Sequence, residues 1–380
     1  MRVQFDVTHP AHVHLFKHAI RTLAAEGHAV AVASRRKEVT TALLDAYGIE
    51  HTVLSTKGST PAALVAEWSL RELRTIRYTR AFEPDVVVSR VLPSAVHAAA
   101  LAGAASVVVT DTEYAGTVSK LVAPFVDYWV TPAAFSGDYG DRQRTHEGFD
   151  ELAYLHPEWF SPDADRLQEF GVDPDEPYAV VRFVSMGAHH DLSRAGFSAA
   201  GKRRLVEALA EDATVYISAE GSLPPELADY EQPVPPAEIH HLLAFADVMV
   251  GDSETMTTEA ALLGTPTIRS NSHATDDALG VFVDLEARGL VESIADEDAA
   301  RERALELLAS DDADERWARR RADLLETTDD VTDHLLDVIA EAADGEGVTD
   351  RDTDSVANTD ADSVGETDTD TATHRRGADE

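Results

Sequence analysis

The chain contains no cysteine, and only five of its 32 basic residues are lysine. Without cysteine it can form neither disulfides nor thiolate intermediates, which fits a cytoplasmic location. It also lacks an apolar run long enough to span a bilayer, because its most apolar window, residues 91–109, is short and interrupted by proline, serine and histidine. The first residues enter a strand-like segment directly, so we expect no signal peptide and no integral membrane segment.

Acidic residues are in large excess, with 70 Asp and Glu against 32 Lys and Arg and a net charge of −38. Because the acids are spread along the whole chain and lysine is scarce, the composition is typical of proteins adapted to high salt, as in halophilic archaea. An acidic partner-binding surface is the weaker interpretation of the same excess. A field of this sign repels phosphate backbones, so we expect no nucleic-acid partner.

Short apolar runs alternate with helical patterns along most of the chain. This β-α order predicts parallel sheets wrapped by helices, the α/β class. The predicted strands are residues 3–7, 29–33, 51–54, 85–88, 106–110, 127–130, 178–184, 214–218, 247–250 and 267–268. The predicted helices are residues 12–26, 37–47, 61–82, 94–102, 202–210, 238–245 and 255–263, followed by a helical segment over 297–340.

Two doubly wound domains in tandem are the fold that this order predicts. We place the first over residues 1–155 and the second over 178–340, joined by a proline-rich connection at 156–177. Open α/β sheets bind ligands at the carboxyl ends of their strands, so the cleft between the domains is the expected site. Residues 341–380 lack Leu, Ile, Phe, Trp, Tyr and Met, and we expect a disordered acidic tail there because little apolar surface can be buried.

Three histidines, His9, His12 and His14, lie where the first predicted strand gives way to the first helix. A helix N-terminus suits an anion, and imidazoles transfer protons near neutral pH. Capping of the helix by Thr8, with the histidines as surface or packing groups, is the alternative for any single histidine, but three within six residues favour function. We therefore take His9 or His12 as a candidate catalytic base. No metal-binding motif accompanies them, so no metal is expected.

A pair of carboxylates, Asp111 and Glu113, follows the predicted strand 106–110. Such a pair can act as a base or hold sugar hydroxyls, and Glu113 is the third candidate base. Capping of the next helix is an equally good interpretation.

Small and polar residues follow the first strand of the second predicted domain. Ser185, Gly187 and the alanine after it allow a phosphate to approach the backbone closely. Arg182, His189 and His190 add polar groups at the same strand end. The spacing is weakly specific, and the position after a strand is the stronger indication of a nucleotide-sugar site.

A helix start after the predicted strand 247–250 is the clearest candidate for a diphosphate site. Ser253 and Thr255 can cap this helix, and its N-terminus favours a diphosphate. Glu259 lies four residues after Thr255 on the same face, where its carboxylate can accept both ribose hydroxyls. Met256 and Thr257 complete the predicted site in the first turn. An ordinary capped helix is the alternative interpretation.

Four arginines, Arg71, Arg74, Arg77 and Arg80, recur along the long predicted helix 61–82. A cationic strip in so acidic a chain could meet an anionic acceptor. Local ion pairs along the helix are the interpretation that we favour. The acids available for these pairs are Glu67, Glu72 and Glu83.

Residues 252–266 resemble the Asp-Ser-Gly-Gly-x-x-Glu-Glu-Ala…Leu-Gly-x-Pro signature of UDP-N-acetylglucosamine 2-epimerases, to which peptidoglycan N-acetylglucosaminyltransferases have a related element. The resemblance implies that Ser253 contacts the diphosphate and that Glu259 holds the ribose. The segment from Ser185 to Ala188 is similar to the Gly-Ser-x-Gly-Ala loop of the transferases. What these families imply is a GT-B fold, with two Rossmann-like domains facing a central cleft.

A more extended resemblance links Thr8-His9-Pro10-x-His12 and residues 182–191 to a prokaryotic family of unknown function, domain of unknown function 354. This family implies a GT-B fold but no established reaction. Glu254-Thr255 replaces the epimerase Gly-Gly, and an epimerase acid expected near Leu92 is missing, although Glu113 matches another. We therefore expect transfer from a nucleotide-diphospho-sugar, UDP-sugar favoured, to an unknown acceptor without a cofactor. An epimerase and a non-catalytic nucleotide-sugar-binding module are the alternatives.

Overall fold

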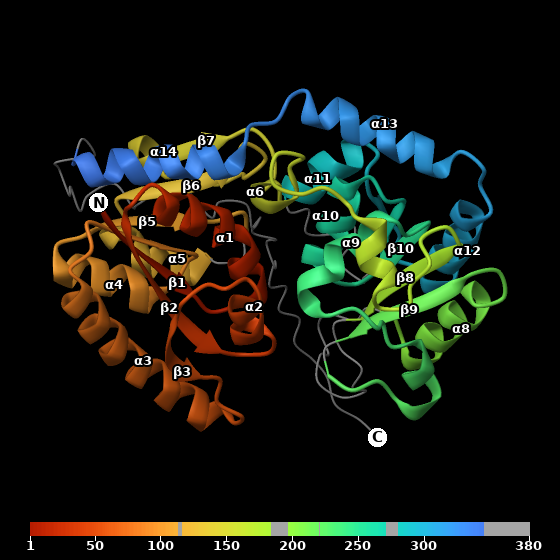
Figure 1. Cartoon of the computed structure of the whole chain (residues 1–380), viewed down its shortest axis with the longest axis horizontal. Coiled ribbons are helices and arrows are strands. Elements are labelled where there is room, and N and C mark those ends of the chain that lie inside the picture. Colours follow the sequence, from red (N-terminus) through yellow and green to blue (C-terminus); the bar gives the residue numbers. More distant parts are fainter. Residues whose placement is uncertain (113–115, 184–196, 220, 271–279, 346–380) are drawn as a thin grey trace, which may run out of the picture. The chain divides into compact units, whose positions relative to one another are not determined.

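Two parallel β-sheets organise the chain, each flanked by the helices that connect its strands (Figure 1). The structure, a computed structural model, describes residues 1–112, 116–183, 197–219, 221–270 and 280–345. All of these residues belong to one compact unit.

The first sheet has seven strands in the order β3-β2-β1-β4-β5-β6-β7, and all neighbours are parallel. The winding direction reverses between β1 and β4, so the loops after these two strands open at the same edge. The central strands are buried on both faces, as parallel strands covered by helices are. The strands are β1 (Arg2–Val7), β2 (Ala29–Arg36), β3 (Thr52–Thr56), β4 (Val86–Ser89), β5 (Ala105–Val109), β6 (Tyr128–Pro132) and β7 (Gln143–His146).

The second sheet has five parallel strands in the order β12-β11-β10-β8-β9. Its winding reverses between β8 and β10, so the loops after these strands again share one edge. The strands are β8 (Tyr178–Phe183), β9 (Thr214–Ala219), β10 (Val248–Gly251), β11 (Thr267–Arg269) and β12 (Glu292–Ser293). Two doubly wound parallel sheets confirm the predicted α/β class.

Fourteen α-helices lie in the described ranges, and none of them combines the length and apolar content that crossing a bilayer requires. Those before the second sheet are α1 (Pro10–Ala25), α2 (Thr40–Ala46), α3 (Pro61–Phe82), α4 (Pro93–Ala102), α5 (Gly116–Val122), α6 (Leu152–Leu155) and α7 (Ala164–Gln168). The later ones are α8 (Ala199–Leu209), α9 (Ile239–Ala244), α10 (Glu254–Leu263), α11 (Gly280–Ala287), α12 (Glu297–Leu308), α13 (Ala313–Leu325) and α14 (Val331–Asp344).

The segment expected to be one helical stretch, residues 297–340, is three helices, α12 to α14. Asp330 interrupts it, since its side chain accepts hydrogen bonds from the backbone N–H groups of Thr332 and Asp333 and so starts a new helix. The predicted start of the acidic tail, residue 341, is also too early in the sequence. Glu341 is inside α14 and pairs with Arg144 of β7, with Nε 2.9 Å from a carboxylate oxygen. Residues 346–380 of that tail lie outside the described residues.

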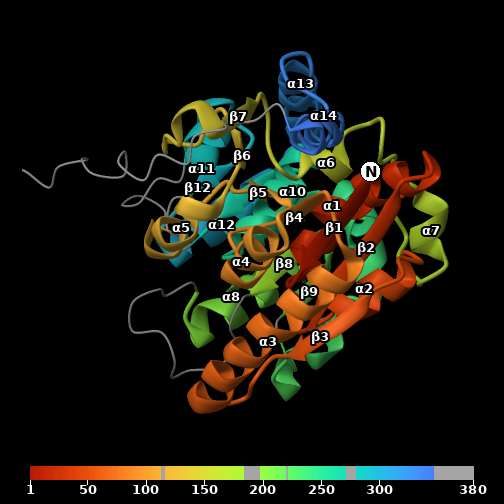
Figure 2. The same cartoon turned by 90° about the vertical axis from the view of Figure 1, so that its left-hand side faces the viewer.

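The helix α14 packs on the first sheet, against β4 to β7, α1 and α6. In Figure 1 it is the blue helix along that sheet, and Figure 2 shows it from the side near α6. Its buried residues Val331, Leu335, Val338 and Ile339 cover strands whose sequence lies almost two hundred residues earlier. We keep the division into domains at 1–155 and 178–340 as a proposal, with α14 counted by its contacts as part of the first.

The expected ion pairs along α3 are not the ones that form. Arg71 is buried and pairs with Asp6 of β1, while Glu67 accepts from Arg35 of β2 at 2.7 Å. Glu72 pairs with His97 of α4, 2.7 Å from its Nδ1. The helix α3 packs against β3 and α4, so its buried and half-buried charged side chains pair with residues of the strands and of α4. They do not pair with residues one turn away on α3 itself.

Candidate functional site

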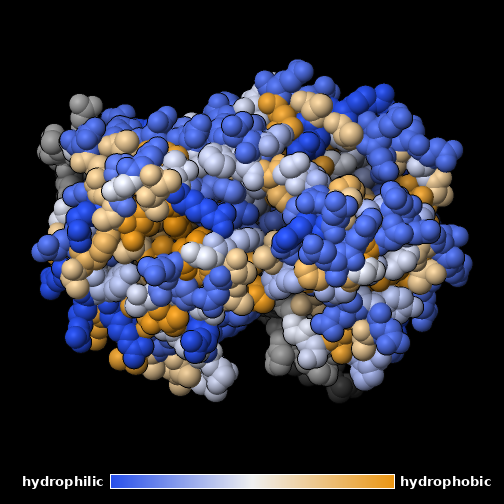
Figure 3. Space-filling view, viewed as in Figure 1, coloured by the Kyte–Doolittle hydropathy of each residue, from blue (hydrophilic) through white to orange (hydrophobic). Residues whose placement is uncertain are grey.

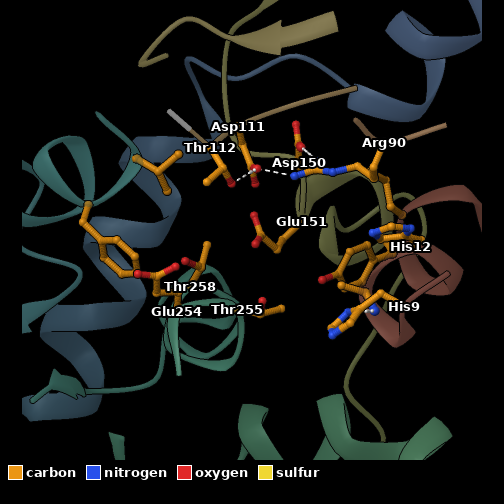
Figure 4. Close-up of a pocket in the computed structure, with 15 residues that line it drawn as sticks. His9, His12, Arg90, Asp111, Thr112, Asp150, Glu151, Glu254, Thr255 and Thr258 are labelled. Atoms are coloured by element: carbon orange, nitrogen blue, oxygen red, sulfur yellow. Dashed lines mark hydrogen bonds and ion pairs between the residues drawn. The ribbon is translucent and has the colours of Figure 1, made fainter. Parts of the chain in front are cut away.

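A cavity of about 210 Å³ lies where loops of both sheets meet, and Figure 4 shows its lining side chains. From the first half come the start of α1, the residues after β4 and β5, and the start of α6. From the second half come the first turns of α10 and of α11. The lining residues are His9, Ala11, His12, Leu15, Arg90, Asp111, Thr112, Asp150, Glu151, Tyr154, Glu254, Thr255, Thr258, Val281 and Phe282.

Arg90 is the cation of this pocket, and it forms ion pairs with both Asp111 and Asp150. Burial opposes its charge, but the two carboxylates outweigh burial and raise the pKa of Arg90. Asp111 also accepts a 2.8 Å hydrogen bond from the Thr112 hydroxyl. The arginine therefore holds two loops of the first sheet together and places one positive charge at the pocket wall.

The ion pair continues away from the pocket into the first sheet. The second oxygen of Asp150 lies 3.2 Å from Nε2 of His146, which ends β7 and is fully buried. Burial would raise the pKa of Asp150, but Arg90 and His146 together lower it. Asp150 therefore stays ionised and fixes the orientation of Arg90.

Glu151 stands next to these charges at the start of α6. Burial raises its pKa well above the usual range, and the negative charges of Asp111 and Asp150 raise it further. A carboxyl group in such surroundings keeps its proton to a higher pH than a free glutamate does. Glu151 thus offers the pocket an acidic proton beside the carboxyl groups of Asp111 and Asp150.

His9 and His12, both predicted from the sequence, line the pocket. Burial, followed by the charge of Lys37, lowers the pKa of His9 to about 4. Burial and Arg90 lower the pKa of His12 well below 6.5. His9 Nδ1 accepts from the backbone N–H of Ala11 at 3.3 Å and caps α1. Both rings are therefore neutral at pH 7. The cap of α1 is His9 and not Thr8, the residue that the alternative interpretation assigns to it.

His14, the third histidine of the group, does not line the pocket. Its ring packs edge-on against His240 of α9, with centroids 4.7 Å apart, and its Nδ1 lies 3.2 Å from the Tyr47 hydroxyl. Burial lowers its pKa well below the usual range. His14 is thus part of the packed contact between α1 and α9.

Glu259, the predicted ribose ligand, is 3% exposed and lies in the same contact. One of its oxygens accepts a 2.8 Å hydrogen bond from the Tyr154 hydroxyl and lies 3.0 Å from Nε2 of His240. Tyr154 lines the pocket, whereas Glu259 stands one layer behind it. In the structure as it stands, Glu259 holds α6, α9 and α10 together. Its role as a ribose ligand stays a prediction.

The helix start predicted after β10 is present. Ser253 caps α10, with its Oγ 3.4 Å from the backbone nitrogen of Met256, and Gly264 ends the helix at φ 87°. Thr255 lines the pocket, whereas Ser253, Met256 and Thr257 do not. Met256 and Thr257 are buried against the sheet. The predicted site residues of this helix are therefore divided between its pocket-facing and core-facing sides.

Glu254, the residue that departs from the epimerase signature, lines the pocket with its carboxylate 3.8 Å from Nη2 of Arg269. Arg269 is the last residue of β11, and its guanidinium lies over the ring of Phe282, 3.9 Å from the ring centroid. The arginine reduces the repulsion that Glu254 would exert on an anion.

Arg182 is the last residue but one of β8 and donates to the Ser218 hydroxyl at 3.1 Å, away from the pocket. Five predicted site residues lie outside the described residues: Glu113, Ser185, Gly187, His189 and His190.

Arg90, Asp150, Glu151, Tyr154 and Thr258 are pocket residues that sequence reasoning missed. Arg90 comes directly after β4, so the rule that strand ends carry the site would have found it. Asp150 and Glu151 follow an edge strand of polar sequence, Gln-Arg-Thr-His, that has no apolar alternation to mark it.

The fold and the position of its pocket define the class to which this protein belongs, the GT-B type, with two Rossmann-like halves. This confirms the fold predicted from the sequence. Within that class the chain belongs to the family described as Protein of unknown function (DUF354), whose model matches residues 1–344. No curated protein matches the chain in a sequence comparison.

Solved structures with this fold are glycosyltransferases and epimerases. The spinosyn forosaminyltransferase SpnP is 16% identical with a TM-score of 0.59, over 90% of this chain and 100% of that one. A UDP co-structure of S. aureus MnaA is 11% identical with a TM-score of 0.63, over 90% and 97%. The UDP-GlcNAc 2-epimerase of Neisseria meningitidis, bound to UDP-GlcNAc, is 13% identical with a TM-score of 0.62, over 90% and 99%. Identities this low show the fold alone.

Proposed function

We propose that the pocket binds the diphosphate and sugar of a nucleotide-diphospho-sugar, UDP-sugar favoured, and that the protein transfers the sugar to an acceptor. The observation that carries the proposal is the joint lining of the pocket by the first turn of α10 and by His9, His12 and Arg90 at strand ends of the first sheet. That UDP and UDP-GlcNAc are bound in two proteins of the same fold supports this donor class.

The donor would lie with its diphosphate at the N-terminus of α10. Free backbone N–H groups and the helix dipole favour an anion there, and the hydroxyls of Thr255 and Thr258 add hydrogen-bond donors. The cavity of about 210 Å³ is smaller than the roughly 300–1,000 Å³ typical of small-molecule sites. A complete nucleotide-sugar would therefore extend beyond it, towards the ends of β8 and β10.

In transfer, an acceptor hydroxyl attacks the anomeric carbon while the bond from that carbon to the diphosphate oxygen breaks. The acceptor proton passes to His9 or His12, as predicted from the sequence. A bound diphosphate would raise the lowered pKa of either ring, because its negative charge stabilises the imidazolium. The proton of Glu151 and the dipole of α10 would stabilise the departing diphosphate.

Epimerisation at the carbon next to the anomeric centre is the second candidate. The three carboxyl groups Asp111, Asp150 and Glu151 at one pocket wall favour it, since such a reaction removes and returns a proton. Proton NMR of the protein with UDP-N-acetylglucosamine alone separates the two reactions. A new sugar formed without an acceptor identifies the epimerase, whereas transfer produces none.

The donor site is tested by a pair of matched variants on α10. If the carboxylate of Glu259 receives the ribose hydroxyls, Glu259→Gln weakens UDP-sugar binding at least about tenfold, the effect of a lost charge-assisted hydrogen bond. Glu254→Gln removes the same charge one and a half turns earlier and leaves binding equal or tighter, because less negative charge faces the diphosphate. Calorimetric titration measures both, and circular dichroism checks folding. Equal loss in the two variants, or none in Glu259→Gln, contradicts the ribose role.

A further inference from the structure

The outer face of α3 combines exposed apolar side chains with arginines. Val65, Leu70 and Leu73 are 65%, 50% and 61% exposed, and Trp68 beside them is 60% exposed. Arg77 and Arg80 are also exposed, and they lie on the same side of the helix as Leu70 and Leu73, opposite the buried residues Glu67, Arg71, Thr75 and Thr79. We call Leu70, Leu73, Arg77 and Arg80 the α3 face. Large exposed side chains of this kind are normally scattered singly over a surface.

Exposed apolar side chains gather in this part of the molecule. Among the described residues, every large apolar side chain that is exposed lies between residues 39 and 125, except Val283 of α11. Leu101 lies on α4, which packs against both α3 and α5, and Leu121 lies on α5. Figure 3 shows orange side chains over the region where Figure 1 places α3 to α5. The rest of the surface in that view is mostly hydrophilic.

The arginines of the α3 face are not neutralised by the acids of their own helix. Glu67 is occupied by Arg35, and Glu72 by His97. Arg77 and Arg80 form no ion pair with another described residue. Arg77 and Arg80 are therefore open to pairing with an anionic partner, although the chain as a whole carries a net charge of −38.

A second copy of the chain fits this face poorly. In a two-fold symmetric contact, the arginines of one face would meet those of the other, which is repulsive. In a head-to-tail contact, the apolar residues would meet a surface that is hydrophilic outside residues 39–125, where only Val283 is a large exposed apolar group among the described residues. A helix face with leucine and arginine side chains instead matches the boundary between lipid headgroups and acyl chains.

We propose that the α3 face docks the protein on a bilayer surface that contains anionic lipid. Leu70 and Leu73 enter the boundary region, and Arg77 and Arg80 pair with lipid phosphates. Contact ion pairs and apolar burial persist at about 0.5 M salt, whereas the repulsion between the acidic remainder of the molecule and the membrane is screened beyond about 4–5 Å. Binding should therefore be measured at that salt concentration.

Co-sedimentation of the full chain with vesicles tests the proposal. The protein should pellet with phosphatidylcholine vesicles that contain phosphatidylglycerol, and at least about tenfold less with phosphatidylcholine alone. Arg77→Gln with Arg80→Gln, and separately Leu70→Ser with Leu73→Ser, should each weaken binding by a similar factor. The matched controls are Arg203→Gln with Arg319→Gln, which changes the net charge equally, and Val283→Ser. Circular dichroism identifies any variant that fails to fold.

Two results would overturn the proposal. One is equal sedimentation of the α3-face variants and their controls, or no sedimentation of the unaltered protein with phosphatidylglycerol vesicles. The other is self-association in analytical ultracentrifugation that the α3-face variants abolish, which would assign the face to a second copy. Neither readout depends on sugar transfer, so failure here leaves the proposed donor site untouched.

Discussion

Arg90 and its neighbours give two adjacent carboxyl groups of the pocket pKa values shifted in opposite directions, lowered for Asp150 and raised for Glu151. Arg90 pairs with Asp111 and Asp150, and its charge lowers the pKa of Asp150. Glu151 forms no ion pair with another described residue, and burial together with the negative charges of Asp111 and Asp150 raises its pKa. Neighbouring carboxyl groups with separated pKa values are a common arrangement for acid–base chemistry.

Glu151→Gln tests whether this proton takes part in the reaction. A general acid must be protonated, so turnover should fall as the pH rises through the raised pKa of Glu151. The variant should lower turnover about 10²–10⁴-fold, remove this alkaline limb and leave UDP-sugar affinity nearly unchanged. Release of UDP from UDP-sugar measures the rate. The matched control is Glu147→Gln, which makes the same substitution at an exposed glutamate outside the pocket lining. An unchanged pH profile in Glu151→Gln would exclude the role.

At the scale of elements, sequence periodicity predicted the helices and strands that have one distinct buried side or are buried on all sides. The central strands are continuous apolar runs, and α3 begins at Pro61 and ends at Phe82 as predicted. The prediction missed α6, four residues long, and β7, which is polar, because their positions depend on tertiary contacts. Tyr154 lies in α6, and Asp150 and Glu151 lie between β7 and α6, so this part of the pocket wall could not be predicted.

Partners far apart in sequence were equally beyond prediction. Glu259 was chosen for a helix face that suits a ribose, and nothing in its own segment indicates that Tyr154 and His240 hydrogen-bond to it. The arginines of α3 were paired with acids one turn away, yet Arg71 reaches Asp6. Local spacing predicts which residues share a face of a helix. The three-dimensional packing decides with which residue each of them forms a hydrogen bond or an ion pair.

The helix α14 provides a test of how the first sheet is completed. Deleting residues from Val331 onward exposes the strands and helices beneath four buried side chains, Val331, Leu335, Val338 and Ile339. Each lost apolar contact of this size costs on the order of 2–3 kcal/mol, so the shortened protein should unfold or aggregate. Ending the chain after Gly345 should leave the melting temperature unchanged, since α14 is kept. Calorimetry compares the two, and equal stability would show that α14 is dispensable.

At the scale of the whole molecule, the charge of −38 acts against folding at low ionic strength. Raising KCl from 0.1 to 1 M shortens the screening length from about 10 to about 3 Å, so the self-repulsion should largely disappear. We therefore expect the melting temperature to rise over this range. Sucrose, which stabilises proteins without screening charge, is the control. A melting temperature that is flat in KCl would show that the described ion pairs already balance the repulsion.

The return of the chain's last helix to the first sheet also bears on how the protein is made. A ribosome releases the seven strands first and α14 only after the entire second sheet has been synthesised. At roughly 5–20 residues per second, the stretch between β7 and α14 takes on the order of 10–40 s to translate. Throughout that interval the strands that α14 will cover remain open to water. The nascent first half must therefore either be shielded by a chaperone or wait, incompletely folded, for α14.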